Sequence, residues 1–358
     1  GLNLNIGGKI TNTNDLYFTA TKTGNGVTMR TNYNADKYVD FIYSLPANGF
    51  NLDFNINLNG LNQVVQGNNV NLNWETTLLQ QEKDVKKEQE HSGPYFKYVE
   101  ETPDHLDLHK DEKKELTEGK IEWFSFKQHF FSAVLIPSAP FEKGNLEVKV
   151  STDPGKIKWY GANMQLPFNQ LAAQNYNFKF YFGTNKFSTL KEQGHEIEKQ
   201  VDLGYWPLKY INRFIVLPVF NFLEGFNWGY GLIILVLTIL LKLAMSPLTY
   251  KSYVSMAKMR VLKPEMDEIK AKVGEDNPTL LQQEYLKLYK QVGVNPIGGC
   301  LPMLLQLPFV MAFFFFFPNL FELRGESFLW MKDLSTYDNF INFGFNVPFI
   351  GDHLSLMC

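Results

Sequence analysis

Residues 225–250 read "GFNWGYGLIILVLTILLKLAMSPLTY" and contain a single charged residue, Lys242. The run is longer than the ~20 apolar residues that a helix needs to cross a bilayer. Trp228 and Tyr230 lie near one end and Tyr250 lies at the other, as aromatic residues do at both membrane surfaces. The sequence therefore predicts a transmembrane helix over residues 225–250.

A second apolar stretch follows, because residues 291–321 contain no charged residue. We predict a second transmembrane helix over residues 296–321. Prolines kink membrane helices, and four of them interrupt this stretch: Pro296, Pro302, Pro308 and Pro318. A third apolar segment begins near Phe340, so residues 340–358 are predicted to start a third transmembrane segment.

The segments between these spans differ in charge. Residues 249–296 hold eight basic and six acidic residues, whereas residues 322–339 hold two basic and four acidic residues. Because basic loops remain in the cytoplasm, we expect residues 251–295 to be cytoplasmic and residues 322–339 to lie outside. Apolar residues recur at helical spacing on both sides of "GEDNP" (274–278), which predicts a cytoplasmic helical hairpin.

The polar faces of this hairpin carry a cluster of basic residues: Lys258, Arg260 and Lys263. They are candidates for contact with a ribosome or another protein. A solvated surface without a partner explains them equally well.

Residues 1–200 alternate polar and apolar residues, as in "FNLDFNINLNG" (50–60), which is typical of strands with one buried face. "TGNG" (23–26) predicts a hairpin turn. We therefore predict one β-rich sandwich domain over residues 1–200. Residues 205–224 have one apolar and one polar helical face, which predicts an amphipathic helix in the membrane interface; a helix covering the β core is the alternative.

Composition excludes several classes of function. A net charge of -3 argues against a general nucleic-acid binder. The two cysteines, Cys300 and Cys358, form no metal-binding motif. His105 and His109 have metal-ligand spacing, but no third ligand is evident, and an exposed surface explains them better. No nucleotide-binding or hydrolase motif occurs, so we expect no cofactor, no metal and no enzyme activity. The sequence looks cut at both ends.

Lys242 is the most informative residue, because charges inside transmembrane helices are costly. Thr238, Lys242 and Ser246 repeat every four residues, with Thr249 nearby, and so form a polar stripe on one helical face. Gln306 adds a polar group in the second apolar stretch. These residues predict a hydrated surface within the bilayer. The alternative for Lys242 is a side chain that reaches to the cytoplasmic interface.

Three strings then resemble a known family: "YKSYVSMAKMRVLKPEMDEIK" (250–270), "VNPIGGCLPMLLQLPF" (294–309) and "SFLWMKDLS" (327–335). They are similar to YidC-type membrane protein insertases of the YidC, Oxa and Albino family, in a form resembling Bacteroidetes. The resemblance implies a multidomain protein with a β-supersandwich periplasmic domain followed by an α-helical membrane insertase core. It also implies a hydrophilic substrate groove, to which Lys242, Thr238, Gln306 and Ser246 are assigned. Relatives usually carry arginine at the position of Lys242.

The resemblance further implies a protein of the bacterial inner membrane with several spans and its large N-terminal domain in the periplasm. Its implied partners are nascent membrane proteins, the Sec translocon with its accessory subunits, the ribosome and the lipid bilayer. We expect no sequence-specific nucleic acid among them. Two alternatives remain: a membrane-anchored module that binds an envelope component through its β domain, and a channel or transporter.

Overall fold

The computed structural model describes residues 1–358 except 48, 275–277, 294–300, 339–340, 348–350 and 355–358. The chain forms two compact units. The β unit comprises residues 1–201 with 319–321, and the helical unit comprises residues 202–318 with 322–358. Each unit is described separately below.

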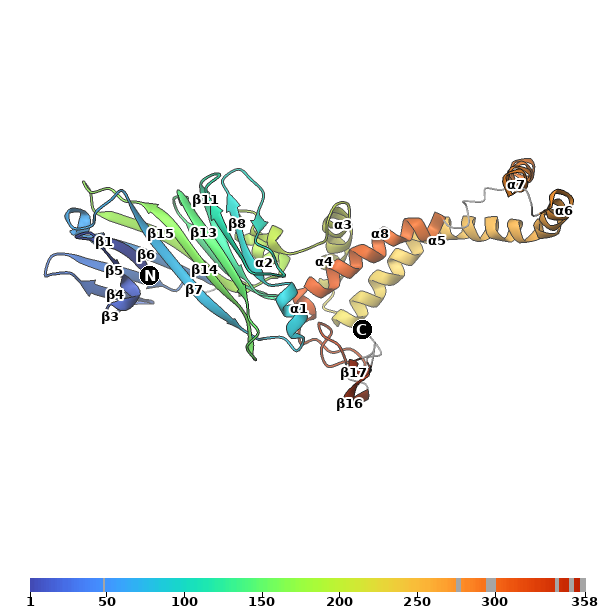
Figure 1. The fold of residues 1–358 in the computed structure, drawn as a ribbon. Coiled ribbons are helices and arrows are strands. Elements are labelled where there is room, and N and C mark those ends of the chain that lie inside the picture. The colour runs from blue at the N-terminus through green and yellow to red at the C-terminus, as the bar shows by residue number, and fades with distance from the viewer. Residues whose placement is uncertain (48, 275–277, 294–300, 339–340, 348–350, 355–358) are drawn as a thin grey trace. The chain divides into compact units, whose positions relative to one another are not determined.

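The β unit consists of two antiparallel sheets (Figure 1). Among the described residues, the first sheet has six strands, in the order β10 (Glu112–Leu116), β13 (Lys143–Val150), β14 (Lys156–Pro167), β7 (Asn69–Leu79), β1 (Leu2–Ile6) and β2 (Lys9–Asn12). The second sheet has nine strands among the described residues. Their order is β3 (Thr19–Thr23), β4 (Gly26–Asn32), β5 (Tyr38–Ser44), β6 (Asn51–Asn59), β15 (Gln174–Thr184), β12 (Phe131–Pro137), β11 (Ile121–Lys127), β8 (Gly93–Tyr98) and β9 (Asp104–His105).

Alternation along the strands produces the core of the β unit. In β6, for example, Phe54, Ile56 and Leu58 are buried, while the residues between them are partly exposed. These side chains join one apolar cluster with residues of both sheets, including Leu72 and Tyr160. Burial of such surface is the main force that holds two sheets together. The predicted sandwich is thus confirmed.

The turn at residues 23–26 also forms as predicted. Thr23 pairs with Gly26 at the end of the β3–β4 hairpin. The two residues between them make the turn, and Gly24 has a φ of 57°, which glycine adopts without steric cost. Shorter elements complete the unit: η1 (Thr13–Asp15), η2 (Leu61–Gln63), α1 (Val85–Glu90), α2 (Phe187–Glu192) and η3 (Ile197–Gln200).

The helical unit begins with a continuous helical segment over residues 208–224. It is built from α3 (Leu208–Ile211), the π-helical turn η4 (Asn212–Val216) and α4 (Leu217–Glu224). The remaining helical elements are α5 (Tyr230–Val261), α6 (Lys263–Val273), α7 (Pro278–Val292), α8 (Leu301–Phe316), η6 (Phe317–Asn319) and η7 (Phe321–Leu323).

The helix predicted over residues 225–250 has different limits in the structure. α5 begins at Tyr230 and continues to Val261, well into the predicted hairpin of residues 251–295. The first helix of that hairpin is therefore α6, which begins at Lys263. The reason is the lack of a helix breaker: after Pro247 the next proline is Pro264, and there is no intervening glycine.

Two further limits also differ. The helix predicted over residues 296–321 is α8, which has 16 residues, and residues 294–300 lie outside the described part of the chain. The described part of residues 340–358 forms β16 (Ile341–Val347) and β17 (Gly351–Leu354) in place of a third apolar span. Apolar and polar residues alternate in "INFGFNV" (341–347), and this period of two favours a strand.

Candidate functional site: a polar cavity between two apolar helices

α5 is the helix of the described residues that is long and apolar enough to cross a membrane. Only 17% of its most apolar 18-residue window is buried inside the protein. A helix whose apolar side chains are not covered by the protein fits a lipid environment better than an aqueous environment. Met303–Asn319 forms a shorter apolar helix, which lies beside α5 (Figure 1).

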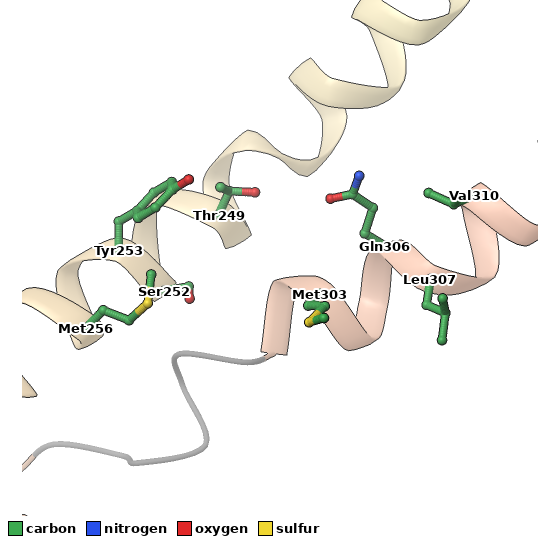
Figure 2. Close-up of a pocket in the computed structure, with 8 residues that line it drawn as sticks. All are labelled: Thr249, Ser252, Tyr253, Met256, Met303, Gln306, Leu307 and Val310. Carbon is green, nitrogen blue, oxygen red and sulfur yellow. The ribbon is translucent and has the colours of Figure 1, made fainter. Parts of the chain in front are cut away.

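A cavity of about 390 Å³ lies between α5 and α8 (Figure 2). α5 contributes its wall from Thr249, Ser252, Tyr253 and Met256, and α8 contributes Met303, Gln306, Leu307 and Val310. Figure 2 shows the Gln306 amide and the Thr249 hydroxyl directed into the space between the helices. Two otherwise apolar helices thus place polar groups on the faces that they turn toward each other.

The polar groups of this cavity differ in their hydrogen bonds. The Thr249 hydroxyl donates to the Met245 carbonyl at 3.0 Å, one helical turn earlier. The amide of Gln306 makes no hydrogen bond within the described part of the chain and is partly exposed. An amide at membrane depth needs water or a polar partner. The cavity can therefore hold water or a polar segment of another chain.

Lys242 lies on the same face of α5 as the cavity but does not line it. It precedes Thr249 by seven residues, which is about 10 Å along the axis and within about 20° around it. Its side chain is exposed and forms no ion pair or hydrogen bond with any described residue. Its ammonium is thus available to a ligand that extends from the cavity along α5.

The other predicted groove residues occupy different positions. The Thr238 hydroxyl donates to the Ile234 carbonyl at 2.8 Å. Thr238 also lines a second, mostly apolar cavity of about 450 Å³, with residues that include Phe317 and Phe328. Ser246 is exposed and lines neither cavity. The structure therefore brings together Gln306 and Thr249. Lys242 lies on the same face of α5, seven residues before Thr249.

Sequence reasoning missed Ser252, Tyr253, Met256 and Met303. Three of them continue the stripe of Lys242 and Thr249 at spacings of three and four residues, so the signal was present. It was overlooked because Tyr250 was taken as the end of the helix. Met303 carries no comparable signal, because an apolar residue in an apolar stretch predicts only burial or lipid contact.

The basic residues predicted for the hairpin lie at the C-terminal end of α5, where Lys258 and Arg260 belong, and at the start of α6, where Lys263 belongs. Lys258, Arg260 and Lys263 are exposed. The hairpin packs through Leu262 and Tyr289, with Met259, Met266 and Tyr285 around them. The hydroxyl of Tyr289 lies 3.3 Å from the Met266 sulfur.

No cluster of three potential metal ligands occurs among the described residues. His105 belongs to the short strand β9 and is exposed. Its Nδ1 lies 2.7 Å from the Leu106 carbonyl, while the backbone N–H of His109 donates to Asp107 at 2.8 Å. These local contacts explain both histidines as parts of a surface loop.

A β sandwich followed by an apolar helix of transmembrane length defines a membrane protein with a large β domain. Comparison with known families specifies it further. Residues 1–221 match the model of the YidC periplasmic domain, and residues 222–357 match that of the 60Kd inner membrane protein. The chain belongs to the YidC family of inner membrane proteins.

Individual relatives agree with this family. The chain is 41% identical to a membrane protein insertase YidC of Phocaeicola vulgatus, over 100% of the chain and 60% of that protein. It is 42% identical to one of Bacteroides fragilis, over 97% of the chain and 58% of that protein. The chain thus spans about three fifths of the length of these relatives.

Similarity to solved structures is weak. An alpha-N-acetylgalactosaminidase from Bifidobacterium bifidum gives a TM-score of 0.37 at 8% identity, over 59% of this chain and 35% of the other. A likeness at this level supports no conclusion about a ligand.

Proposed function

We propose that the chain belongs to a membrane protein insertase, which moves nascent hydrophobic segments and their short polar tails into the inner membrane through a hydrophilic groove. The support comes from the relatives, which are named as insertases. The observation that carries the mechanism is the cavity between α5 and α8. There Gln306 lies without a hydrogen-bond partner among the described residues, in a helix that is otherwise apolar.

The energetics of insertion explain what such a cavity would do. A Leu-like residue gains roughly 0.3–0.6 kcal/mol at the bilayer centre, so twenty of them supply on the order of 10 kcal/mol. Each Asp or Lys in a tail that must cross costs roughly 2.5–3.5 kcal/mol. A hydrated groove part-way across the bilayer lowers this cost, because the tail keeps polar neighbours. Partitioning then drives insertion without ATP.

Lys242 would act as the charged contact of the groove. Its ammonium faces no acidic group of the described chain, so it attracts an acidic tail that enters from the cavity. Thr238 and Ser246 would extend the polar stripe along α5. The contact is transient because a lysine ammonium offers a single point of charge, without the two-pronged geometry of arginine.

The remaining parts follow from this arrangement. α5 would cross the inner membrane, with α8 as a second span, and residues 208–224 would lie in the interface with Phe214 and Phe222 toward lipid, as both are exposed. The β unit would lie in the periplasm. The end of α5 with Lys258 and Arg260, and the start of the hairpin at Lys263, would meet the ribosome or the Sec translocon with its accessory subunits. No cofactor is required.

A charge series at residue 242 tests the proposal. Lys242→Arg, Lys242→Ala and Lys242→Glu are compared in the full-length protein, with one client that has an acidic tail and one that has a neutral tail. We expect Lys242→Arg to retain insertion of both. Lys242→Glu should lower insertion of the acidic client by about tenfold, a change of 1.4 kcal/mol, and affect the neutral client little. Equal insertion of the acidic client by Lys242→Glu and wild type would refute the electrostatic role.

A further inference from the structure

The helical segment of residues 208–224 contains a π-helical turn over Asn212–Val216. Such turns are rare and are frequently found at functional sites. Asn212, the first residue of the turn, is 0% exposed. A fully buried asparagine among apolar residues requires an explanation beyond packing, because each of its polar atoms loses water on burial.

Both amide protons of Asn212 have partners. Its Nδ2 donates to the Ala312 carbonyl at 2.7 Å and to the Leu203 carbonyl at 2.9 Å. Its Oδ1 is buried and has no hydrogen-bond partner among the described residues. An apolar residue would have avoided this unsatisfied oxygen, so the two donated bonds are what Asn212 contributes at this position.

Ala312 belongs to α8, the helix that also carries Gln306. The two residues are six positions apart, which is about 9 Å along the axis. Pro308 lies between them and has no N–H, so the helical hydrogen bond to the Leu304 carbonyl is missing at this point. α8 nevertheless continues as one helix from Leu301 to Phe316, so the part that lines the cavity is joined to the part that Asn212 holds.

Aromatic contacts surround the same end of α8. Phe220 packs against Phe316 with ring centroids 5.7 Å apart, and Tyr205 packs against Phe315 at 5.5 Å. Both ring pairs meet edge to face, so they too favour one geometry and hold this end of α8 against Tyr205 and Phe220. The bond from Asn212 to Ala312 adds a polar contact of defined direction to one carbonyl of α8.

We propose that Asn212 is a positioning residue of the groove. By donating to the Ala312 carbonyl it keeps α8 in the rotation that turns Gln306 toward Thr249. This inference rests on the proposed function, because it assigns Asn212 to the same cavity. It links the amphipathic segment of residues 208–224 to the shape of the site that would receive the client.

The test uses variants that change donors while preserving shape, in the full-length protein in lipid nanodiscs. Asn212→Asp is isosteric and donates only when the new carboxyl is protonated. A carboxyl buried against two carbonyl oxygens has a raised pKa, so lowering the pH from 9 to 5 restores a donor. Asn212→Leu has none at either pH. Asn221→Asp is the matched control, because Asn221 lies exposed on the same segment.

Two quantities are measured for each variant. Spin labels at Val254 and Leu304, with Cys300 and Cys358 replaced by serine, report the separation of α5 and α8. Photo-crosslinking of a stalled client from Met303 reports occupancy of the cavity. At pH 9 we expect Asn212→Asp to broaden the distance distribution and to lower crosslinking about fivefold, the factor that one lost hydrogen bond represents.

At pH 5, Asn212→Asp should approach wild type in both measurements, while Asn212→Leu remains altered and Asn221→Asp remains normal throughout. A merely structural defect would show no recovery with pH. Wild-type distances in Asn212→Leu would overturn the proposal, and so would altered distances with unchanged crosslinking. If wild type itself gives no client crosslink, the proposed function fails, while the distance measurement still decides the role of Asn212 in holding α8.

Discussion

The β unit and the helical unit each contain a lysine in an unusual setting, and the two lysines differ in their hydrogen-bond partners. In the β unit, the fully buried Lys158 donates to the Ser92 carbonyl at 2.6 Å and to the Leu108 carbonyl at 2.7 Å. In the helical unit, Lys242 is exposed and has no partner among the described residues. One lysine is committed to the protein's own backbone, while the other remains available.

This difference separates structure from function. A buried charge with its partners in the same chain stabilises one conformation, and removing it leaves unsatisfied groups. A charge on an apolar helix without a partner contributes nothing to the fold and persists at a cost. The comparison indicates that a charge with partners in the chain, such as Lys158, serves the fold, whereas a charge without one, such as Lys242, remains available for function.

The largest effect should come from a core residue of the β unit. Trp123 is 0% exposed, and its Nε1 donates to the His195 carbonyl at 2.9 Å. Trp123→Ala should lower the free energy of unfolding by about 3–5 kcal/mol through the cavity it creates. Phe314→Ala is the matched change in α8, where Phe314 is 69% exposed, and should cost about 0.5 kcal/mol or less. Urea denaturation followed by hydrogen exchange of peptides from each unit measures both.

The same substitution at the two lysines should have opposite effects on stability and on insertion. Lys158→Met should destabilise the β unit by about 2 kcal/mol, because two buried carbonyls lose their donor. Insertion by Lys158→Met should fall only in proportion to the loss of folded protein. Lys242→Met should leave the unfolding of both units unchanged and should impair insertion of acidic clients. If Lys158→Met were neutral for stability, the contrast between a structural and a functional lysine would fail.

The stability of the β unit should also depend on pH. Burial lowers the pKa of Lys158 from 10.5 to about 8. Between these values the unfolded chain binds a proton that the folded chain does not, so stability rises with pH in this window. The free energy of unfolding should increase by about 1 kcal/mol from pH 8 to pH 9. Subtracting the profile of Lys158→Met removes the other titrating groups; identical profiles would contradict the assignment.

Much of the fold could be predicted, because both units show clear periodicity. Alternation in strands such as β6 indicated the sandwich, and the length of apolar sequence indicated α5. The strand β8 (Gly93–Tyr98) is not evident in the sequence, because it lies within the charge-rich residues 81–118. All six of its residues are buried. Lys97 is buried there because Glu122 of the neighbouring strand pairs with it, which local sequence does not reveal.

The site was predictable in part. Gln306 and Thr249 were recognisable as polar residues in apolar stretches, and the cavity contains both. Lys242 and Ser246 were expected beside them but do not line the cavity. Spacing along one helix does not show which of its residues the partner helix faces. Asn212 lies in the segment predicted to be an amphipathic helix, where an asparagine is expected on the polar face, whereas its side chain is buried against Ala312. Contacts between residues a hundred positions apart follow from packing, which a single sequence does not contain.

The smallest effect on insertion should come from removing the β unit altogether. Its apolar core is continuous within residues 1–201, and its buried Lys158 donates to backbone carbonyls of the same unit. An insertase that acts through α5 and α8 should therefore keep most of its activity when residues 1–201 are deleted from the full-length protein.

A membrane-anchored binding module would behave differently, because its ligand site would lie in the β unit. That unit does contain a cavity of about 420 Å³ lined by aromatic residues such as Trp74 and Phe180. Comparing the deletion with Lys242→Glu in the same insertion assay decides between the two. Loss of activity in the deletion, together with normal activity in Lys242→Glu, would move the functional site from the helices to the β unit.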